Sequence, residues 1–181
     1  DGKSLGAASA NAALARHFAS FQKALDSRKS KREWFCTLEK SDDCRADYLL
    51  LESATFGASG APGYEPLKTA AARAVALCRE HSISRVAFVC HGDNASARAV
   101  ATLEGALLGD FTDKRFKGPA KDAESPAQLD VQFVVEKNDE KTIASALREA
   151  EIIIDAQNEA RELTNAPHHV LTPVAMAAFA S

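Results

Sequence analysis

Hydrophobic and polar positions along the chain repeat with two periods, which predict helices and strands in alternation. Apolar residues spaced three and four apart predict helices at 6–30, 66–81, about 95–108 and 139–163. Strands are predicted at 33–38, 48–51, 86–90 and 129–135. The last of these alternates like a half-exposed strand, and the run at 48–51 suits a strand covered on both faces. The order indicates an α/β protein with a mixed, mostly parallel sheet.

Residues 160–173 read as a helix end, a stop and a new helix. Asn165 leaves the right-handed helical region at low cost, and Pro167 cannot continue a helix. Thr172 is a good N-cap, and Pro173 fits the first helical position. The new helix has no stop signal before the last residue. We therefore expect an α/β domain over 1–165, followed at 166–181 by a linker and the start of a helix that belongs to a further domain.

Composition narrows the class of protein. The chain has 181 residues, 46% hydrophobic and 26% charged, which fits one globular domain. No apolar run reaches the ~20 residues of a membrane helix, and the first residues show no signal-peptide pattern. The net charge of −3 gives no overall attraction to nucleic acid. The basic clusters at 28–32 and 114–121 are therefore interpreted as solvated surface, with nucleic-acid binding kept as the alternative. Because the first residue is Asp1 and the only methionine is Met176, we expect residues before position 1.

The four cysteines lack the two-residue spacing of a zinc or redox motif. Cys78 and Cys90 fall within apolar patterns, which is typical of small buried side chains. We expect Cys36, Cys44, Cys78 and Cys90 to be free thiols of a reducing compartment, with a disulfide as the alternative.

The histidines are the first candidates for catalytic or metal-binding residues. HExxH and GxSxG motifs are absent, and His17 and His81 have no second ligand four residues on. His91 and Asp93 follow a buried strand, where α/β proteins place ligand groups, but a turn with Asp93 or Asn94 as helix cap is the preferred interpretation. Neighbours in a turn point apart, so His168 and His169 are expected in linker packing and not in chelation.

Two further segments carry no specific chemistry. Residues 53–63 are rich in glycine and could form a ligand loop at the edge of a sheet, but Gly57, Gly60 and Gly63 lack a phosphate-binding spacing. Asp155 and Glu159 form an ordinary exposed acidic pair. The sequence thus predicts no catalytic, cofactor-binding or metal-binding residue in this chain.

Three segments resemble the leucyl (cytosol) aminopeptidase family in the family's order. Ala160–Pro173 is similar to its hinge pattern Ala-Arg-(Asp/Glu)-Leu-x-Asn-x-Pro-x-x-x-Leu-Thr-Pro. Glu104–Lys117 resembles Glu-Gly-x-x-Leu-x-x-Tyr-x-Phe-Asp-x-Tyr-Lys, with Phe111 and Phe116 at positions that are often tyrosine. The Ala-rich stretch 67–75 and the strand at 86–88 resemble the helix and strand before it. His168 and His169 depart from the family, which usually has Pro, Ala or Asn there.

The resemblance implies a three-layer, macro-domain-like α/β fold that precedes a catalytic domain. In this family two divalent metals, Zn or Mn, polarise the peptide carbonyl and activate water to remove N-terminal residues. The family's metal-binding motifs, Gly-Lys-Gly-x-x-x-Asp-x-Gly-Gly and Asn-Thr-Asp-Ala-Glu-Gly-Arg, are absent here, so no catalytic residue can be carried over. The resemblance further implies that the domain contacts its own catalytic domain and assembles into a homo-oligomer, a hexamer. It implies a location in the cytoplasm or in an organelle such as the mitochondrion. It also implies a strand before residue 1.

A second hypothesis belongs to another class of protein. The chain could be a stand-alone macro-like module that binds a nucleotide or a protein and has no peptidase activity. Residues 53–63 and 91–94 would then line its site, and ADP-ribose and simple nucleotides would be the first ligands to try.

Overall fold

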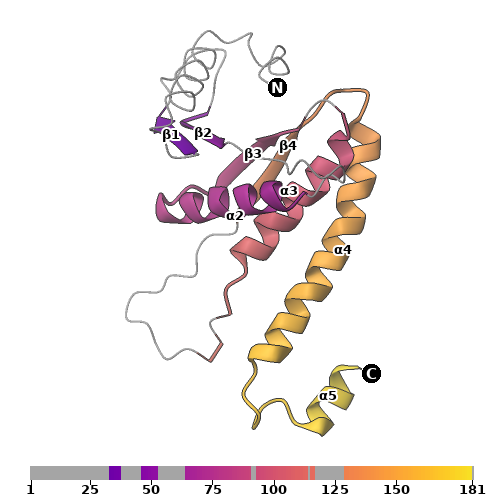
Figure 1. The fold of residues 1–181 in the computed structure, drawn as a ribbon. Helices are drawn as coiled ribbons and strands as arrows, with labels where there is room; N and C mark the ends of the chain where they lie inside the picture. The colour runs from indigo at the N-terminus through magenta and orange to yellow at the C-terminus, as the bar shows by residue number, and fades with distance from the viewer. Residues whose placement is uncertain are drawn as a thin grey trace. The chain divides into compact units, whose positions relative to one another are not determined.

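The computed structural model describes residues 33–37, 46–52, 64–90, 93–113, 115–116 and 129–180 (Figure 1). The predicted helix at 6–30, the glycine-rich segment 53–63 and most of the basic segment 114–121 lie outside these residues. The chain divides into two units, residues 1–66 and 67–181.

The first unit contains an antiparallel pair of strands, β1 (Glu33–Thr37) and β2 (Tyr48–Glu52). Glu33 lies opposite Glu52, and Thr37 lies opposite Tyr48. Both strands were predicted, but the apolar run in β2 is only partly covered: Tyr48 is 39% exposed and the leucines after it are half-buried. Partial exposure is common in antiparallel strands, whereas coverage of both faces is typical of parallel ones.

The second unit alternates helices and strands (Figure 1). Helix α2 (Glu65–Glu80) starts at the boundary between the units, and strand β3 (Arg85–Val89) follows it. Then come α3 (Ala95–Asp110), β4 (Asp130–Val134), α4 (Glu140–Asn165) and α5 (Pro173–Phe179). Strands β3 and β4 pair in parallel, as a helix between two strands favours. The predicted α/β class is confirmed, with parallel and antiparallel strand pairs and a small parallel sheet flanked by helices.

One face of the parallel pair carries the core of this unit. Phe88 in β3 and Val131 and Phe133 in β4 alternate with exposed neighbours and pack against the helices. The alternating sequence pattern predicted this arrangement for β4. Helix α3 lies between α2 and α4 (Figure 1): its Ala106 packs with α2, and its Leu103 packs with α4. Other apolar residues spaced three and four apart on α3 and α4 are buried or half-buried: Val100, Leu107, Ile143, Leu147, Ala150, Ile154 and Leu163.

Helix α3 starts where predicted, but its end and its capping contact differ from the prediction. Gly109 directly follows the helix predicted at about 95–108, and glycine is a common helix stop, yet α3 continues through it to Asp110. The Asp110 carboxylate accepts two hydrogen bonds from Arg79, at 2.7 and 2.6 Å. Glycine stands at 109 for another reason: a Cβ there would lie 2.7 Å from the Ala72 Cβ. At the N-terminus, Asn94 occupies the cap position, but with φ 59° its side chain makes no capping hydrogen bond. Capping side chains normally act from an extended backbone. Asp93 does not cap α3 either.

The end of α4 agrees with the predicted stop, with one difference. Asn165 remains helical, and the chain turns at Ala166, which is extended (φ −69°, ψ 131°) because it precedes Pro167. Thr172 caps α5 as predicted, accepting a hydrogen bond from the Ala175 N–H at 3.2 Å. Helix α5 ends at Phe179, before the last residue. Within the described ranges, none of the helices combines the length and apolar character needed to cross a membrane.

Candidate functional site at the hinge

The predicted candidate histidines do not converge on a site in the described residues. His168 and His169 are exposed, with ring centroids 5.6 Å apart and ring planes at 86°. This edge-to-face packing agrees with the preferred linker interpretation. His81 and Asp93 are exposed at the ends of other elements. Asp155 and Glu159 are exposed on α4, as predicted. His17 and His91 lie outside the described residues.

A metal centre needs several ligands in one place, and the described part of the chain does not supply them. Among those residues, no three His, Cys, Asp or Glu side chains gather closely enough to hold a metal ion. The two metals implied by the family resemblance therefore do not fit the described residues.

Two cysteines are free thiols within the core, as predicted. Cys78 on α2 and Cys90 after β3 are buried. Burial raises the pKa of both thiols, partly offset at Cys78 by the charge of Arg79 and at Cys90 by a hydrogen bond with Thr102. A raised pKa keeps a thiol protonated and poorly nucleophilic, so both are structural residues. The side chains of Cys36 and Cys44 lie outside the described residues.

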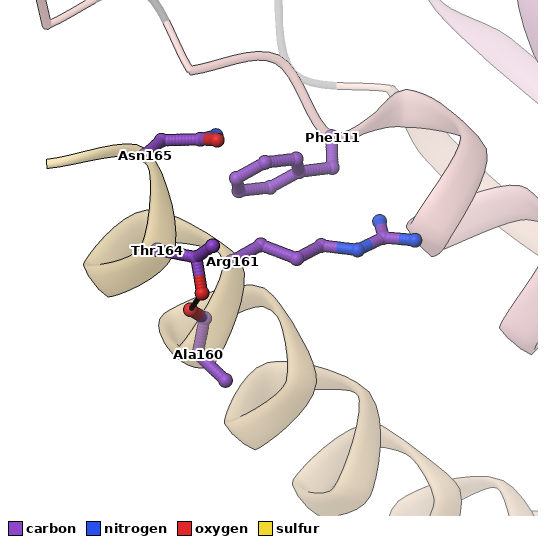
Figure 2. Close-up of a pocket in the computed structure, with 5 residues that line it drawn as sticks. All are labelled: Phe111, Ala160, Arg161, Thr164 and Asn165. Carbon is purple, nitrogen blue, oxygen red and sulfur yellow. Dashed lines mark hydrogen bonds between the residues drawn. The ribbon is translucent and has the colours of Figure 1, made fainter.

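The described residues instead bring together the two most specific family-like segments, 104–117 and 160–173. Arg161, near the end of α4, donates a hydrogen bond to the carbonyl of Leu108 in the last turn of α3 at 2.9 Å. Its guanidinium carbon lies 5.5 Å from the centroid of the Phe111 ring, within the range of a cation–π contact (Figure 2). A contact at 3.5 Å with the Asn158 Oδ1 supports the same side chain from one turn earlier.

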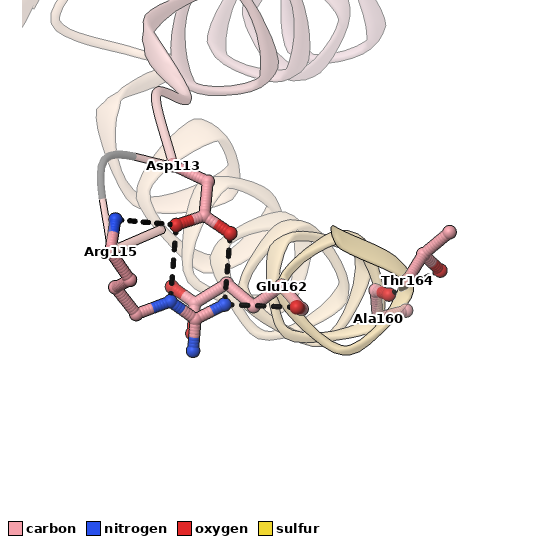
Figure 3. A network of polar contacts seen from close by, with 5 residues as sticks. All are labelled: Asp113, Arg115, Ala160, Glu162 and Thr164. Carbon is pink, nitrogen blue, oxygen red and sulfur yellow. Dashed lines mark hydrogen bonds and ion pairs between the residues drawn. The ribbon is translucent and has the colours of Figure 1, made fainter. Parts of the chain in front are cut away.

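A second arginine makes the opposite connection. Arg115, in the segment after α3, donates to the Glu162 carbonyl of α4 at 2.9 Å and lies 3.2 Å from the Glu162 carboxylate (Figure 3). Its guanidinium also donates to both carboxylate oxygens of Asp113, at 3.1 and 3.0 Å. The Arg115 backbone N–H donates to Asp113 as well, at 3.1 Å. Asp113 thus holds the arginine in the orientation in which it meets α4.

The electrostatics of this group follow from that geometry. Hydrogen bonds from Arg115 lower the pKa of Asp113 to about 2, with a smaller contribution from Asn165. The same contact raises the pKa of Arg115. The Asp113 side chain is only 7% exposed, so its charge is paired in a covered position. Asp113 is therefore ionised at all ordinary pH values.

A shallow, open hollow of about 420 Å³ lies at the same junction. Its lining residues come from both segments: Phe111, Ala160, Arg161, Thr164 and Asn165 (Figure 2). The Thr164 hydroxyl is already bonded to the Ala160 carbonyl at 2.8 Å. The polar groups here therefore connect the end of α3 to the end of α4, and the arrangement has a structural role. The sequence placed Arg115 in a basic cluster interpreted as solvated surface and Arg161 in the hinge pattern, but it predicted no contact for either.

Comparisons with known proteins show which proteins this chain is similar to. The chain is 33% identical over 141 residues to a probable cytosol aminopeptidase of Solibacter usitatus, an alignment covering 77% of this chain and 28% of the relative. It is 26% identical over 149 residues to a probable cytosol aminopeptidase of Synechococcus elongatus, covering 82% and 29%. No family model matches the sequence.

Solved structures agree with the sequence comparison. The bottromycin maturation enzyme BotP, in complex with Mn, is similar with a TM-score of 0.54 and 26% identity. The match covers 85% of this chain and 31% of that one. A second structure of BotP gives the same TM-score at 25% identity. Over about four-fifths of its length, the chain is similar to members of the cytosol aminopeptidase family. It spans less than a third of the length of the curated relatives that it matches.

Proposed function

We propose that this chain is the N-terminal, non-catalytic domain of a leucyl-aminopeptidase-like exopeptidase that uses two metals to remove N-terminal amino acids from peptides. The observation that carries the proposal is the alignment with a cytosol aminopeptidase, which covers 77% of this chain but only 28% of the relative. Most of the relative thus has no counterpart here. In this proposal the domain boundary follows residue 165, and residues 166–181 connect to the catalytic part.

Two features of the chain support this division of labour. The described residues contain no cluster that could hold a metal, although the similar BotP is described in complex with Mn. Four large apolar side chains near the C-terminal end are 45–79% exposed: Val170, Val174, Met176 and Phe179. Exposed apolar residues that gather in one segment often mark a contact with another domain. In this proposal the domain also helps to assemble the homo-oligomer, a hexamer, and shapes the access of peptides to the active site. The enzyme would act in the cytoplasm.

The first test is peptidase activity of the purified chain. With Mn²⁺ or Zn²⁺ and leucine p-nitroanilide, we expect no hydrolysis above a control without protein, because the metal-binding motifs are absent. Hydrolysis that survives repurification and is removed by a chelator would overturn the non-catalytic assignment.

An inactive chain is also expected of a stand-alone macro-like module, so a second test separates the two. The intact mass of the protein from its natural source should be well above 19.3 kDa, and that protein should hydrolyse leucine p-nitroanilide with Mn²⁺. A natural protein of 19.3 kDa that binds ADP-ribose in a calorimeter would instead establish the module. Light scattering of the natural protein then tests the hexamer.

A further inference from the structure

The contacts of Arg115 and Arg161 are reciprocal. Arg161 belongs to α4 and bonds to a carbonyl in the last turn of α3, while Arg115 follows α3 and bonds to a carbonyl in the last turn of α4. The last four carbonyls of a helix have no partner within that helix. Leu108 and Glu162 both fall in these last turns. Each arginine therefore satisfies a free carbonyl of the opposite helix.

Electrostatics favour the same arrangement. Helix C-termini carry partial negative charge, so a cation near one is stabilising. Neither α3 nor α4 has a basic residue of its own in the last turn. Arginine from the other segment supplies that charge at both ends. Its planar guanidinium also contacts an aromatic ring in each case: Phe116 at 5.4 Å from Arg115, and Phe111 at 5.5 Å from Arg161.

The position of this pair in the chain gives it a consequence. Glu162 precedes the turn at Ala166 and Pro167, where the chain leaves α4 for α5. Across the turn, the Val170 and Leu171 N–H groups both bond to the Pro167 carbonyl, at 2.8 and 3.0 Å. The turn is therefore internally closed. Its direction depends on how firmly the last turn of α4 is held, and α3 is the element to which the two arginines attach it.

We propose that Arg115 and Arg161 form a reciprocal clamp that fixes the end of α4 to the end of α3 and so sets the direction in which residues 166–179 leave the domain. The clamp uses one hydrogen bond in each direction, and Asp113 is the positioning residue for Arg115. The inference concerns this chain alone and does not depend on what the following residues catalyse. Its test involves no peptidase measurement. The clamp can therefore fail while the proposed function stands, and the proposed function can fail while the clamp stands.

The clamp is tested first by amide hydrogen exchange on the purified chain. We expect Arg161→Ala and Arg115→Ala to speed exchange about 3- to 10-fold at 162–171, the factor for losing one hydrogen bond of ~0.7–1.4 kcal/mol. Exchange in β3 and β4 should stay unchanged. Arg148→Ala is the matched control, since Arg148 is an exposed arginine on α4 before the clamp. Arg161→Lys keeps a donor for the Leu108 carbonyl and should retain most of the protection.

The direction of the exit is tested by distance measurement between two spin labels. Labels at Glu80 and Ala178, both exposed, would be introduced as cysteines after Cys36 and Cys44 are changed to serine. The unmodified clamp should give one narrow distance distribution, and Arg115→Ala with Arg161→Ala should broaden it. An unchanged width, equal broadening in Arg148→Ala, or a uniform rise in exchange through β3 and β4 would each overturn the clamp.

Discussion

Gly105 of α3 lies directly against the backbone of Lys68 in α2. A methyl group built on Gly105 would be 2.2 Å from the Lys68 carbonyl oxygen and 2.5 Å from its Cα. The two helices therefore cross with no room for a side chain between them at this point. An ion pair beside the crossing, between Lys68 Nζ and Glu104 Oε1 at 2.9 Å, joins the same two turns.

We predict that Gly105→Ala destabilises the protein although alanine is the better helix former. Alanine gains about 1 kcal/mol of intrinsic helix propensity over glycine. Its Cβ would force apart two backbones, and overpacking of this kind costs about 1–3 kcal/mol, so a net loss of up to about 2 kcal/mol is expected. Urea unfolding measures it. Because the clash is with backbone atoms, Lys68→Ala should not restore stability in the double variant. A Gly105→Ala protein as stable as wild type would show that the helices separate freely.

Gly109 makes the matching prediction with a different partner. A Cβ on Gly109 would lie 2.7 Å from the Ala72 Cβ and 2.9 Å from its Cα, so the tightest contact is with a side-chain atom. Gly109→Ala should cost about 1 kcal/mol, and adding Ala72→Gly should recover part of that loss despite the poor helix propensity of glycine. A double-mutant cycle by urea unfolding gives the coupling. Strictly additive single effects would contradict the contact.

Strand β4 and Gly109 show what could and could not be predicted from the sequence. The alternation of Val131 and Phe133 with exposed neighbours located β4, because a strand turns every second side chain to the same face. Gly109 has the appearance of a helix stop in the sequence. It lies inside the helix, and the nearby Ala72, distant in sequence, leaves room there only for a small residue. Local patterns carry no information on such a crossing.

The hinge could be predicted for the same reasons, and only in part. Pro167 and Thr172 act locally, so the turn and the cap of α5 followed from the sequence. The contacts of Arg115 and Arg161 join residues 47 and 53 positions apart, which no spacing rule connects. The capping role predicted for Asn94 is not observed: its backbone is left-handed, and its side chain makes no capping hydrogen bond.

The ion pair of Arg79 with Asp110 should couple more strongly than a surface pair. Its side chains are 27% and 25% exposed and share two hydrogen bonds. Asp110 ends α3, where the helix dipole disfavours a negative charge, so its stability depends on Arg79. A cycle of Arg79→Gln and Asp110→Asn should give about 1 kcal/mol of coupling, with the arginine change the more harmful of the two singles.

The Arg85–Asp130 pair provides the control for that cycle. Its atoms are 3.2 Å apart, but its side chains are 72% and 52% exposed. Water screens such a pair, so Arg85→Gln with Asp130→Asn should show about 0.3 kcal/mol of coupling or less. Equal coupling in both cycles would mean that exposure does not govern these interactions.

The low pKa of Asp113 predicts acid sensitivity in a defined range of pH. Its pKa is about 2 in the folded protein, chiefly through hydrogen bonds from Arg115, against about 3.9 in an unfolded chain. Between these values the unfolded state binds more protons, so this contribution to stability is full above about pH 4 and is lost as the pH falls toward 2. Asp113→Asn should therefore lower the urea midpoint at pH 6. The difference from wild type should shrink from pH 4 downward and vanish near pH 2.

Arg115→Ala should produce the same pattern, because it removes the donors that lower the Asp113 pKa. Comparing each variant with wild type at every pH cancels the titration of the other carboxylates, which all three proteins share. If either difference in midpoint stays constant from pH 6 to pH 2, the loss comes from packing and not from the paired charge. A difference that closes in that window for both variants would show that the Asp113 carboxylate and the Arg115 guanidinium stabilise the fold as one unit.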